Sequence, residues 1–585
     1  MILRLVEFNG ELPIILPRNL PDSVSQFSLD VRDGQRFAPI RDSELVTTLP
    51  APTTEYKTIY RHNGAWLGWE NYVKAIPGAV ALDRLYIFGD GAPKIRVADT
   101  EYLLALPSPS TKLTESVTGT ATSDSGTNRL YVYTNVTSLG EESAPCDISD
   151  GVYWKPGQDV VLSGFETPPA GRLITKQRIY RSQQSFSGTQ LYYIDERPAS
   201  NSNYTDSISS SKITSALKTL GYNAPIDTLE GAVSFPGGVM VAFSGKDLWF
   251  CEPYKHEAWP ESYMQSVDEE IVALGVFGHT VAIMTKGNLY VTTGYTPDSM
   301  TLEKLELNLP CVNAQGVEDM GYSIVYPTHS GLVSVDQSGA RLITMSSIGI
   351  DKWKKFTPEG FVSGQYNGRY IAAYKTFDAR TGTEISGSLV IDATLQTPYI
   401  SRLSVFADAF YYALETGELF HIIGRNISKF NSEAVLAKSL TWVSKDFYLR
   451  KPSSFGAVYI DAANSITADE LAIINEQIDL AIAANAVLFA TASLNTNSLN
   501  DAEVNHFALN ASDMNPLVLD PSAYQNININ VYADDRLIAT ITTANKLSRL
   551  PAGFLAKKWV IEIVSNIPID AVTMANTGFE LSQVQ

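Results

Sequence analysis

The side chains that could hold a metal ion or act as nucleophiles are few and widely separated. The chain of 585 residues has six histidines, His62, His256, His279, His329, His421 and His506. No two of them have an H-x-x-x-H or similar metal-binding spacing, and none stands beside a cysteine cluster, so we predict no metal site. The three cysteines, Cys146, Cys251 and Cys311, are odd in number and far apart. We therefore expect reduced thiols made in a reducing compartment and no disulfide framework.

Motifs for covalent or phosphate chemistry do not occur in the sequence. There is no G-x-S-x-G, Walker or kinase signature, and Gly237 and Gly238 precede an expected strand where a phosphate site would need a helix. A glycosidase needs two carboxylates across a cleft, which any of the 63 acidic residues could supply. The densest acidic cluster, Asp268 to Glu270, is more simply a solvated charge run. We predict no enzyme activity, no catalytic, cofactor-binding or metal residues, and no cofactor.

Aromatic residues gather in one short stretch. It contains Trp249, Phe250, Tyr254, Trp259 and Tyr263, with Lys255-His256-Glu257 between the two tryptophans. We expect a loop folded back on a sheet, whose rings seal neighbouring sheets. The alternative is a carbohydrate-stacking platform or a subunit contact, because tyrosine and tryptophan are common at interfaces.

Short apolar runs separated by turn residues repeat from about residue 230 to 430. The units are VMVAFSGKDLWF, TVAIMTKGNLYV, SIVYPTHSGLVSV, RYIAAYKTF…GSLVID and AFYYALETGELFHI. Their starts lie roughly 35–45 residues apart, as in the blades of a β-propeller. Residues 56–104 could supply one more blade, with Leu85 to Phe88 as a strand that runs into the Gly89-Asp90-Gly91 turn. An ordinary meander or two packed sheets is the alternative.

The predicted fold class is mainly β, with four segments. Residues 1–106 form a Pro-rich, irregular arm and the first propeller strands, and a linker rich in Ser, Thr and Pro follows. Residues 107–212 form an inserted β-sandwich; the phrases YVYTNV…GEESAP, RIYRS and LYYIDE are similar to fibronectin type III-like modules. Residues 213–434 form the propeller-like core, and residues 435–585 form a C-terminal β domain that carries one long helix.

That helix is predicted at about 467–492. Thr467 and Glu470 have capping-box spacing, and Leu471, Ile474, Ile478 and Ile482 fall on one helical face. The second half, 480–494, carries no charge but is too short to span a bilayer. It is either packed against a sheet or a sister helix, or it is a membrane-touching or bundle-forming element. After it, Asp534 to Arg536 is predicted to form a hairpin turn.

The charge balance limits the partners. There are 44 basic and 63 acidic residues, a formal charge of −19, whereas tight DNA binding relies on basic groups that neutralise phosphates. An acidic surface could instead let DNA slide past. The N-terminus does not have the pattern of a secretory signal and no apolar run is long enough to span a bilayer, so we expect a soluble protein made in the cytoplasm.

One family resemblance is carried by LWFCEPYKHEAWPESY and the following IVALGVFGHTVAIMTKGNLYVTTGYTPDSM. This stretch resembles virion structural proteins of tailed bacteriophages, with the best match over about 230–340. WVSKDFYL, ANTGFEL and the insert GEESAPC…RIYRS fit the same group. Within that group, it resembles the tail nozzle or hub (tail tubular protein B-like) proteins of short-tailed phages.

The resemblance implies a structural protein of the virion tail without enzyme activity. It implies a homo-oligomer, a hexameric ring below the portal and adaptor, which contacts tail fibres or spikes and through which phage DNA passes during ejection without specific binding. Synthesis would take place in the host cytoplasm. Two alternatives stay open: a glycan-binding or depolymerising receptor-binding protein of a phage, and a bacterial β-propeller lectin or enzyme.

Overall fold

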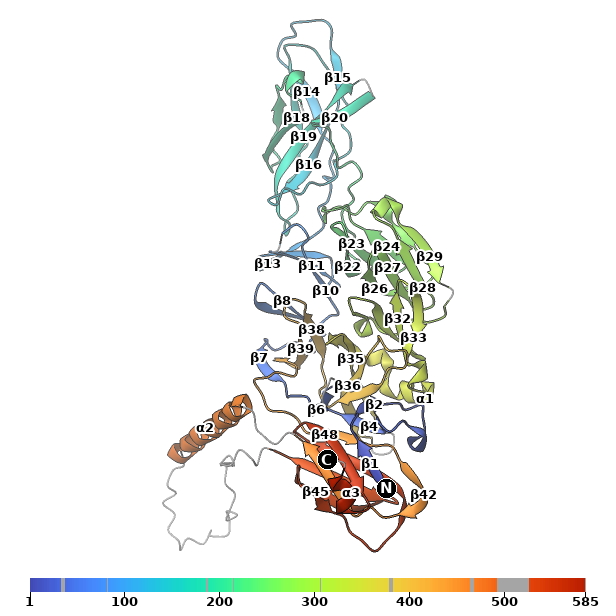
Figure 1. Ribbon diagram of the computed structural model, residues 1–585. Coiled ribbons are helices and arrows are strands. Elements are labelled where there is room, and N and C mark those ends of the chain that lie inside the picture. The colour runs from blue at the N-terminus through green and yellow to red at the C-terminus, as the bar shows by residue number, and fades with distance from the viewer. Residues whose placement is uncertain are drawn as a thin grey trace. The chain divides into compact units, whose positions relative to one another are not determined.

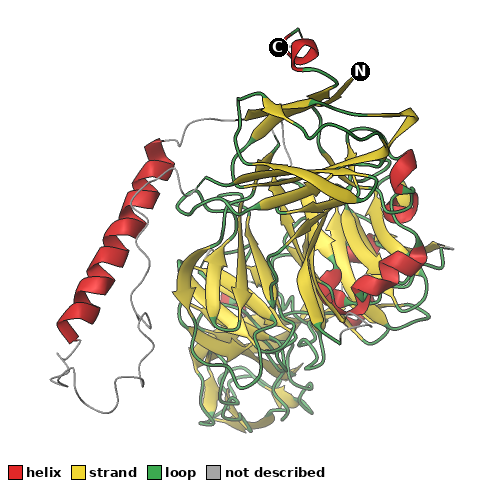
Figure 2. Cartoon of the chain, turned by 90° about the horizontal axis from the view of Figure 1, so that it is seen from below, coloured by secondary structure: helices red, strands yellow, loops and turns green. Residues whose placement is uncertain are grey.

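The computed structural model describes residues 1–32, 37–81, 83–185, 188–213, 215–305, 307–377, 382–462, 468–491 and 525–583. The protein is mainly β, with 48% strand and 9% helix (Figures 1 and 2). It forms two compact units. The first unit joins residues Met1–Pro50 to Leu342–Gln585, and the second unit is Ala51–Arg341. The boundaries of these two units differ from those of the four predicted segments, and the division does not test those segments, which stay predictions.

Four-stranded antiparallel sheets of consecutive strands recur in the second unit. Each runs strand by strand, because short apolar runs of β-branched and aromatic residues alternate with tight turns. The sheets are β10 (Lys74–Pro77), β11 (Arg84–Phe88), β12 (Lys94–Val97) and β13 (Thr100–Leu103); β22 (Glu230–Phe235), β23 (Val239–Ser244), β24 (Asp247–Phe250) and β25 (Gln265–Ser266); β26 (Ile271–Phe277), β27 (Thr280–Thr285), β28 (Leu289–Thr293) and β29 (Thr301–Leu305); and β30 (Glu318–Asp319), β31 (Ile324–Thr328), β32 (Gly331–Asp336) and β33 (Gly339–Leu342). A hairpin of β8 (Thr58–His62) and β9 (Ala65–Trp69) precedes them.

An inserted module, defined here as strands β14 to β21, interrupts this series after β13. Its sheets share one core that includes Tyr131, Val160 and Ile179. Their strands are β14 (Thr114–Thr118), β18 (Asp159–Ser163) and β21 (Tyr204–Asp206); β16 (Tyr131–Thr137), β19 (Ile174–Ser185) and β20 (Gly188–Pro198); and the pair β15 (Thr127–Arg129) and β17 (Val152–Trp154).

In the first unit, the N-terminal segment supplies strands to sheets built by later residues. This segment was predicted to be irregular. That prediction is wrong, because its short apolar stretches between prolines find partner strands far along the chain. The segment runs along other elements of this chain: β1 (Ile2–Leu5) pairs with β48 (Ile569–Ala575), and β7 (Glu44–Thr48) completes the sheet of β38 (Ala409–Ala413), β39 (Glu418–Ile423) and β40 (Asn426–Lys429).

The remaining strands of the first unit form one large sheet and two small ones. The large sheet contains β34 (Val362–Tyr366), β35 (Arg369–Phe377), β36 (Glu384–Ile391), β37 (Ile400–Leu403), β4 (Phe27–Leu29), β41 (Leu440–Val443), β47 (Ala556–Ser565), β44 (Ile527–Ala533) and β45 (Arg536–Ile541), with β2 (Asn9–Glu11), β3 (Val24–Ser25) and β42 (Phe447–Ser453) at its sides. In a smaller sheet, β43 (Ala457–Ala462) pairs with β48 and with β46 (Ser548–Arg549), and β5 (Val31–Arg32) pairs with β6 (Ala38–Pro39).

The predicted hairpin turn at Asp534 to Arg536 is confirmed. Ala533 pairs with Arg536 across the turn, and Asp534 and Asp535 have φ of 44° and 65°. Two consecutive left-handed residues match the right-handed twist of the two strands, and aspartate tolerates that conformation better than most residues.

Helices are few among the described residues. The α-helices are α1 (Ile350–Trp353), α2 (Ala468–Thr491) and α3 (Gly578–Ser582), and the 3₁₀ turns are η1 (Pro17–Asn19), η2 (Ser210–Lys212), η3 (Glu261–Tyr263), η4 (Pro297–Ser299), η5 (Ala314–Gly316), η6 (Ile343–Ser346), η7 (Lys354–Phe356) and η8 (Pro358–Gly360).

Helix α2, the long red helix of Figure 2, confirms the predicted helix. Its expected cap residue Thr467 lies outside the described residues. The predicted apolar face is only partly buried, since Ile474 is 2% exposed whereas Leu471 and Ile482 are 40% and 47% exposed. Helical spacing places side chains on one face, but tertiary contacts decide whether that face is covered. No helix in the described part of the chain is long and apolar enough to cross a membrane.

Candidate functional site

The histidines are scattered in the structure. His62, His256 and His421 are buried in different places, and His506 lies outside the described residues. Burial lowers the pKa of both His256 and His421 to about 4. Within the described ranges, no group of three or more His, Cys, Asp or Glu side chains could hold a metal ion.

The cysteines are free and buried, which confirms that they form no disulfides with one another. Burial raises the pKa of Cys146 to about 11 and those of Cys251 and Cys311 to about 12. Because the thiolate is the nucleophile, such thiols are unreactive near neutral pH.

The acidic cluster Asp268 to Glu270 lies at the surface, as predicted, and it forms ion pairs there. Asp268 pairs with Lys304 at 2.9 Å, Glu270 pairs with Lys286, and the Tyr290 hydroxyl donates to Glu269 at 2.6 Å. The hydrogen bond from Lys304 lowers the pKa of Asp268, and that from Tyr290 lowers the pKa of Glu269. These carboxylates are held ionised, which is typical of a solvated charge run.

The aromatic cluster is packed inside the protein. Trp249 is 8% exposed, Phe250 and Trp259 are fully buried, and only Tyr254 is largely exposed, at 57%. The tryptophan faces therefore offer no stacking platform for a sugar. The indole N–H of Trp259 donates to the carbonyl of His256 at 2.8 Å, and its ring meets Phe88 edge-on.

The loop between these tryptophans folds back on its own sheet, which confirms that prediction. The Glu252 N–H donates to the Ala258 carbonyl at 2.8 Å, and the Tyr254 N–H donates to the Gly238 carbonyl at 2.9 Å. Tyr254 has a positive φ of 58°, and a Cβ on Gly238 would lie 2.4 Å from the Tyr254 ring. Gly238 is therefore needed to let this loop close.

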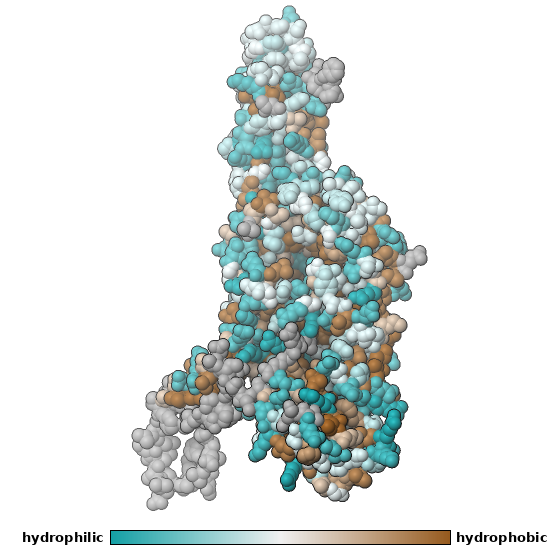
Figure 3. Space-filling view, in the orientation of Figure 1, coloured by the Kyte–Doolittle hydropathy of each residue, from teal (hydrophilic) through white to brown (hydrophobic). Residues whose placement is uncertain are grey.

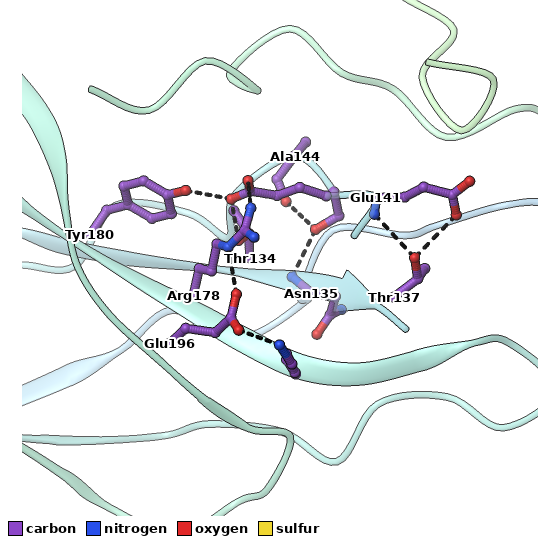
Figure 4. Close-up of polar contacts among 11 residues, drawn as sticks. Thr134, Asn135, Thr137, Glu141, Ala144, Arg178, Tyr180 and Glu196 are labelled. Carbon is purple, nitrogen blue, oxygen red and sulfur yellow. Dashed lines mark hydrogen bonds and ion pairs between the residues drawn. The ribbon is translucent and has the colours of Figure 1, made fainter. Parts of the chain in front are cut away.

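A second loop, residues 137–144, leaves strand β16 of the inserted module (Figure 4). The Glu142 carboxylate accepts hydrogen bonds from the Thr134 hydroxyl at 2.7 Å, an Arg178 Nη1–H at 2.7 Å and the Tyr180 hydroxyl at 2.5 Å. Arg178 is held in turn by Glu196, whose Oε2 lies 2.9 Å from Arg178 Nε. Four side chains from three neighbouring strands thus fix the loop at Glu142.

Glu141, the neighbour of that anchored residue, is held by its own loop. Its N–H donates to the Thr137 hydroxyl oxygen at 3.1 Å, and the Thr137 hydroxyl lies 3.2 Å from Glu141 Oε2 (Figure 4). Glu141 Oε1 lies 3.6 Å from Arg84 Nη1 of strand β11. The Glu141 side chain therefore links the inserted module to the β10–β13 sheet.

The two loops and strand β11 enclose one pocket, which we call the carboxylate pocket. It has about 90 Å³ of space and is lined by Arg84, Tyr86, Glu141, His256 and Glu257, among others. The Tyr86 ring meets the His256 ring edge-on at 4.6 Å, and His256 Nε2 lies 3.2 Å from the Gly238 carbonyl. Residues from three separate stretches of sequence meet here.

The electrostatics of the carboxylate pocket are unusual because it contains a buried acid, Glu257, beside a half-buried one, Glu141. Burial, with a further contribution from the charge of Glu141, raises the pKa of Glu257 to about 7. Burial also raises the pKa of Glu141, and Arg84 opposes that shift. Glu257 is 4% exposed, and its Oε1 accepts no hydrogen bond from any described residue. Two like charges in one buried site favour retention of a proton.

Such a pair can bind and release a proton near neutral pH. A carboxyl group with this pKa could act as a general acid or base, but only beside a bound substrate. The space of about 90 Å³ is well below the roughly 300–1,000 Å³ of pockets that hold organic ligands. The arrangement is therefore suited to a proton-dependent contact between the inserted module and the sheets.

Sequence reasoning did not identify this pair. Glu141 belongs to GEESAP and Glu257 to Lys255-His256-Glu257, and both phrases were noted without being linked. No spacing rule connects residues so far apart in the sequence. The one indication was that charged residues interrupt two otherwise apolar or aromatic stretches.

Comparisons with known proteins give only distant structural likenesses. No family model matches the chain, and no curated protein matches it. Among solved structures, "Structure of Dos1 propeller" is 10% identical with a TM-score of 0.26 and covers 73% of this chain and 93% of that one. Hsv2 of Kluyvelomyces marxianus is 9% identical, with a TM-score of 0.23 and coverages of 48% and 71%. The dihydro-heme d1 dehydrogenase NirN is 12% identical, with a TM-score of 0.23 and coverages of 54% and 61%.

Proposed function

We propose that this chain is a structural component of a bacteriophage tail, a nozzle or hub subunit that forms a hexameric ring below the portal and adaptor. In the virion, the ring would contact tail fibres or spikes and form part of the channel through which DNA leaves. The proposal rests first on the resemblance of residues 230–340 to such proteins. We further propose that the subunit has a β-propeller-like core, a fibronectin type III-like insert and a C-terminal β domain.

The observation that carries the proposal is the succession of four-stranded sheets. In the second unit, β10 contacts β22, β22 contacts β26, and β26 contacts β30 and β31. First strands of successive sheets lie together in this way around the axis of a propeller. In the first unit, β34 contacts β38, and β7 completes a sheet begun more than 300 residues later. Pairing of an early strand with a late sheet is how a circular array of sheets can be closed.

The charge of the chain supports passage of DNA without binding. A formal charge of −19 repels phosphates, whereas cationic walls would hold DNA by many ion pairs of large combined strength. Cyclic rings use heterologous contacts, in which different surfaces of neighbouring subunits meet. A rigid acidic β protein fits a mechanical task of this kind.

Binding or cleavage of glycans receives less support. The tryptophans that could have stacked on sugars are buried, and the carboxylate pocket is too small for a saccharide. We therefore put forward no second function.

Electron microscopy of the purified full-length protein tests the proposal. We expect class averages with six-fold symmetry and a central hole, and gold-labelled antibodies that bind at the tail of the virion. A compact monomer without a pore, labelling away from the tail, or turnover of a sugar or ester in a hydrolase screen would each contradict it.

A further inference from the structure

Two edge strands of the first unit line one groove. Strand β1 lies at the end of its sheet; among the described strands it pairs only with β48, and β42 pairs only with β47. Residues 1–4 and 446–449 line the same groove, which has about 530 Å³ of space. We call it the β1–β42 groove.

The backbone on the open sides of these strands is available for pairing. Apart from the ladder to β48, the β1 residues Ile2 to Leu5 form no backbone hydrogen bond with a described residue, and Phe447 to Leu449 form none apart from their ladder to β47. An edge strand presents alternate N–H and C=O groups outward, so it can accept one more strand.

The groove has an apolar lining and a charged rim. Leu3, Phe447 and Leu449 are half-buried and pack on the core of this unit, and Phe455 beside them is fully buried. Tyr448 is 57% exposed. Figure 3 shows hydrophobic and hydrophilic side chains interspersed over this part of the molecule. A segment with alternating apolar and polar residues can place one face on such a lining and the other at the rim.

The rim carries unpaired positive charge in an otherwise acidic protein. Arg4 and Arg18 line the groove and are exposed, and their side chains form no hydrogen bond or ion pair with any described residue. The two carboxylates of the groove are already paired, Asp22 with Lys445 at 3.0 Å and Asp446 with Lys558 at 3.3 Å. The free charge of the groove is therefore positive, and arginine forks favour carboxylates.

We propose that the β1–β42 groove binds an extended acidic segment of another protein, which adds a strand to one or both edges and pairs its carboxylates with Arg4 and Arg18. The free backbone edges favour a polypeptide over a nucleic acid, because only a polypeptide can extend a β ladder. The positive rim repels basic strands and favours acidic over neutral ones, which limits indiscriminate edge pairing. This inference is independent of ring formation, so either proposal can fail alone.

The test uses the full-length protein and a short fluorescent peptide in which glutamate alternates with valine. We expect saturable binding in fluorescence anisotropy at low ionic strength. Replacing glutamate by lysine should abolish binding, and N-methylation of alternate peptide nitrogens should weaken it at least about tenfold, because it removes hydrogen bonds of the added strand. A single-stranded oligonucleotide should not compete.

Matched protein variants distinguish the effect of the two rim arginines on peptide binding from the effect of the net charge of the protein. Arg4→Glu combined with Arg18→Glu should weaken peptide binding about tenfold, the product of two exposed ion pairs. Arg536→Glu, an exposed arginine of strand β45 in the same unit, should leave it unchanged. Unfolding curves show whether the variants fold; if the double variant does not, the salt dependence of the wild-type protein provides the same test, with binding lost as salt rises.

Four results would overturn the inference. The N-methylated peptide could bind as well as the unmodified one, the oligonucleotide could compete, or the double variant could bind normally. The fourth is self-association, measured by sedimentation equilibrium, that depends on Arg4 and Arg18 while the peptide fails to bind, which would assign the groove to a second copy of this chain.

Discussion

Two buried clusters of charged side chains lie in the second unit, and they are built in opposite ways. In the inserted module, Asp206 accepts hydrogen bonds from Arg181 at 2.6 Å and from the Tyr131 hydroxyl at 2.7 Å, and Arg129 lies 3.6 Å away. In the carboxylate pocket, the buried Glu257 lies beside the half-buried Glu141. Among the described residues, the one ion pair of these two acids is that of Glu141 with Arg84.

The difference shows how burial acts on paired and on like charges. Opposite charges at hydrogen-bond distance replace the water that each has lost, so the members of the Asp206 cluster hold one another in place. Like charges gain nothing from each other, so the carboxylate pocket favours a proton instead. The first cluster is a fixed support, and the second is a contact whose strength depends on pH.

The comparison can be tested most severely at Asp206. Asp206→Asn leaves Arg129 and Arg181 buried without a counter-charge, so we expect a loss of about 3–5 kcal/mol of unfolding free energy. Urea unfolding followed by fluorescence measures it. Asp150→Asn is the control, because Asp150 pairs with Lys112 at the surface. Equal losses of unfolding free energy in the two variants would show that the Asp206 cluster does not stabilise the inserted module more than a surface ion pair does.

Substitution of Trp259 should loosen the packing of the loop that carries Glu257. Trp259→Ala deletes a fully buried side chain, which costs about 3–5 kcal/mol, and it should also weaken the pH response of stability because Glu257 becomes solvated. Thermal unfolding at pH 5 and pH 8 reports both effects. Tyr254→Ala, in the same loop but 57% exposed, should cost less. A full pH response in the Trp259 variant would contradict the link between loop packing and the raised pKa.

The pH dependence itself should disappear in Glu257→Gln. Burial raises the folded pKa of Glu257 from 4.5 to about 7, so the folded state binds the extra proton and wild-type stability falls as pH rises from about 4.5 through about 7. Above pH 7 the variant should be more stable than the wild type by up to about 3 kcal/mol, and near pH 4 the two should agree. Urea titrations across this range test it.

The exposed Glu303 provides the control for that experiment. Glu303→Gln should leave the pH profile of the wild type unchanged. A Glu257→Gln profile that parallels the wild type would show that folding does not raise the pKa of Glu257 and that the pocket is not a proton site.

The smallest effect is expected at Arg84. Arg84→Met removes the partner of Glu141 at 3.6 Å, which raises the Glu141 pKa further and lowers stability by about 1 kcal/mol above pH 7. The loss should shrink as the pH falls and the two carboxylates take up protons. Arg96→Met, on strand β12 of the same sheet and paired with Asp99, serves as the control. A loss that is equal at both pH values would indicate packing, not charge.

Local patterns were sufficient to predict many of the strands and turns. The unit TVAIMTKGNLYV forms the hairpin of β27 and β28, and Asp534-Asp535 forms the predicted turn between β44 and β45. Both could be predicted because period-two apolar residues and turn chemistry act over a few residues. The loop between Trp249 and Trp259 was also predicted to fold back. Its two tryptophans could not be assigned to a core or to a surface platform until the packing around them was known.

Pairing across long stretches of sequence was beyond such patterns. The Pro-rich residues 1–50 contain the edge partner of β48 and the last strand of the β38–β40 sheet, yet they lack the regular alternation of a strand. Glu141, Glu257 and Arg84 meet although nothing in their spacing suggests it. Short-range sequence periods reflect the geometry of one element, whereas long-range contacts depend on how whole sheets pack.

Composition and local periodicity alone determined that this protein is mainly β, acidic, and equipped with three separate thiols, because those properties follow from residue types and spacings of a few positions. Tertiary structure alone decided which carboxylates lose their water and share a pocket, and which backbone edges stay open beside unpaired arginines. Burial and pairing are properties of the space around a group, and that space is filled by residues from distant parts of the chain.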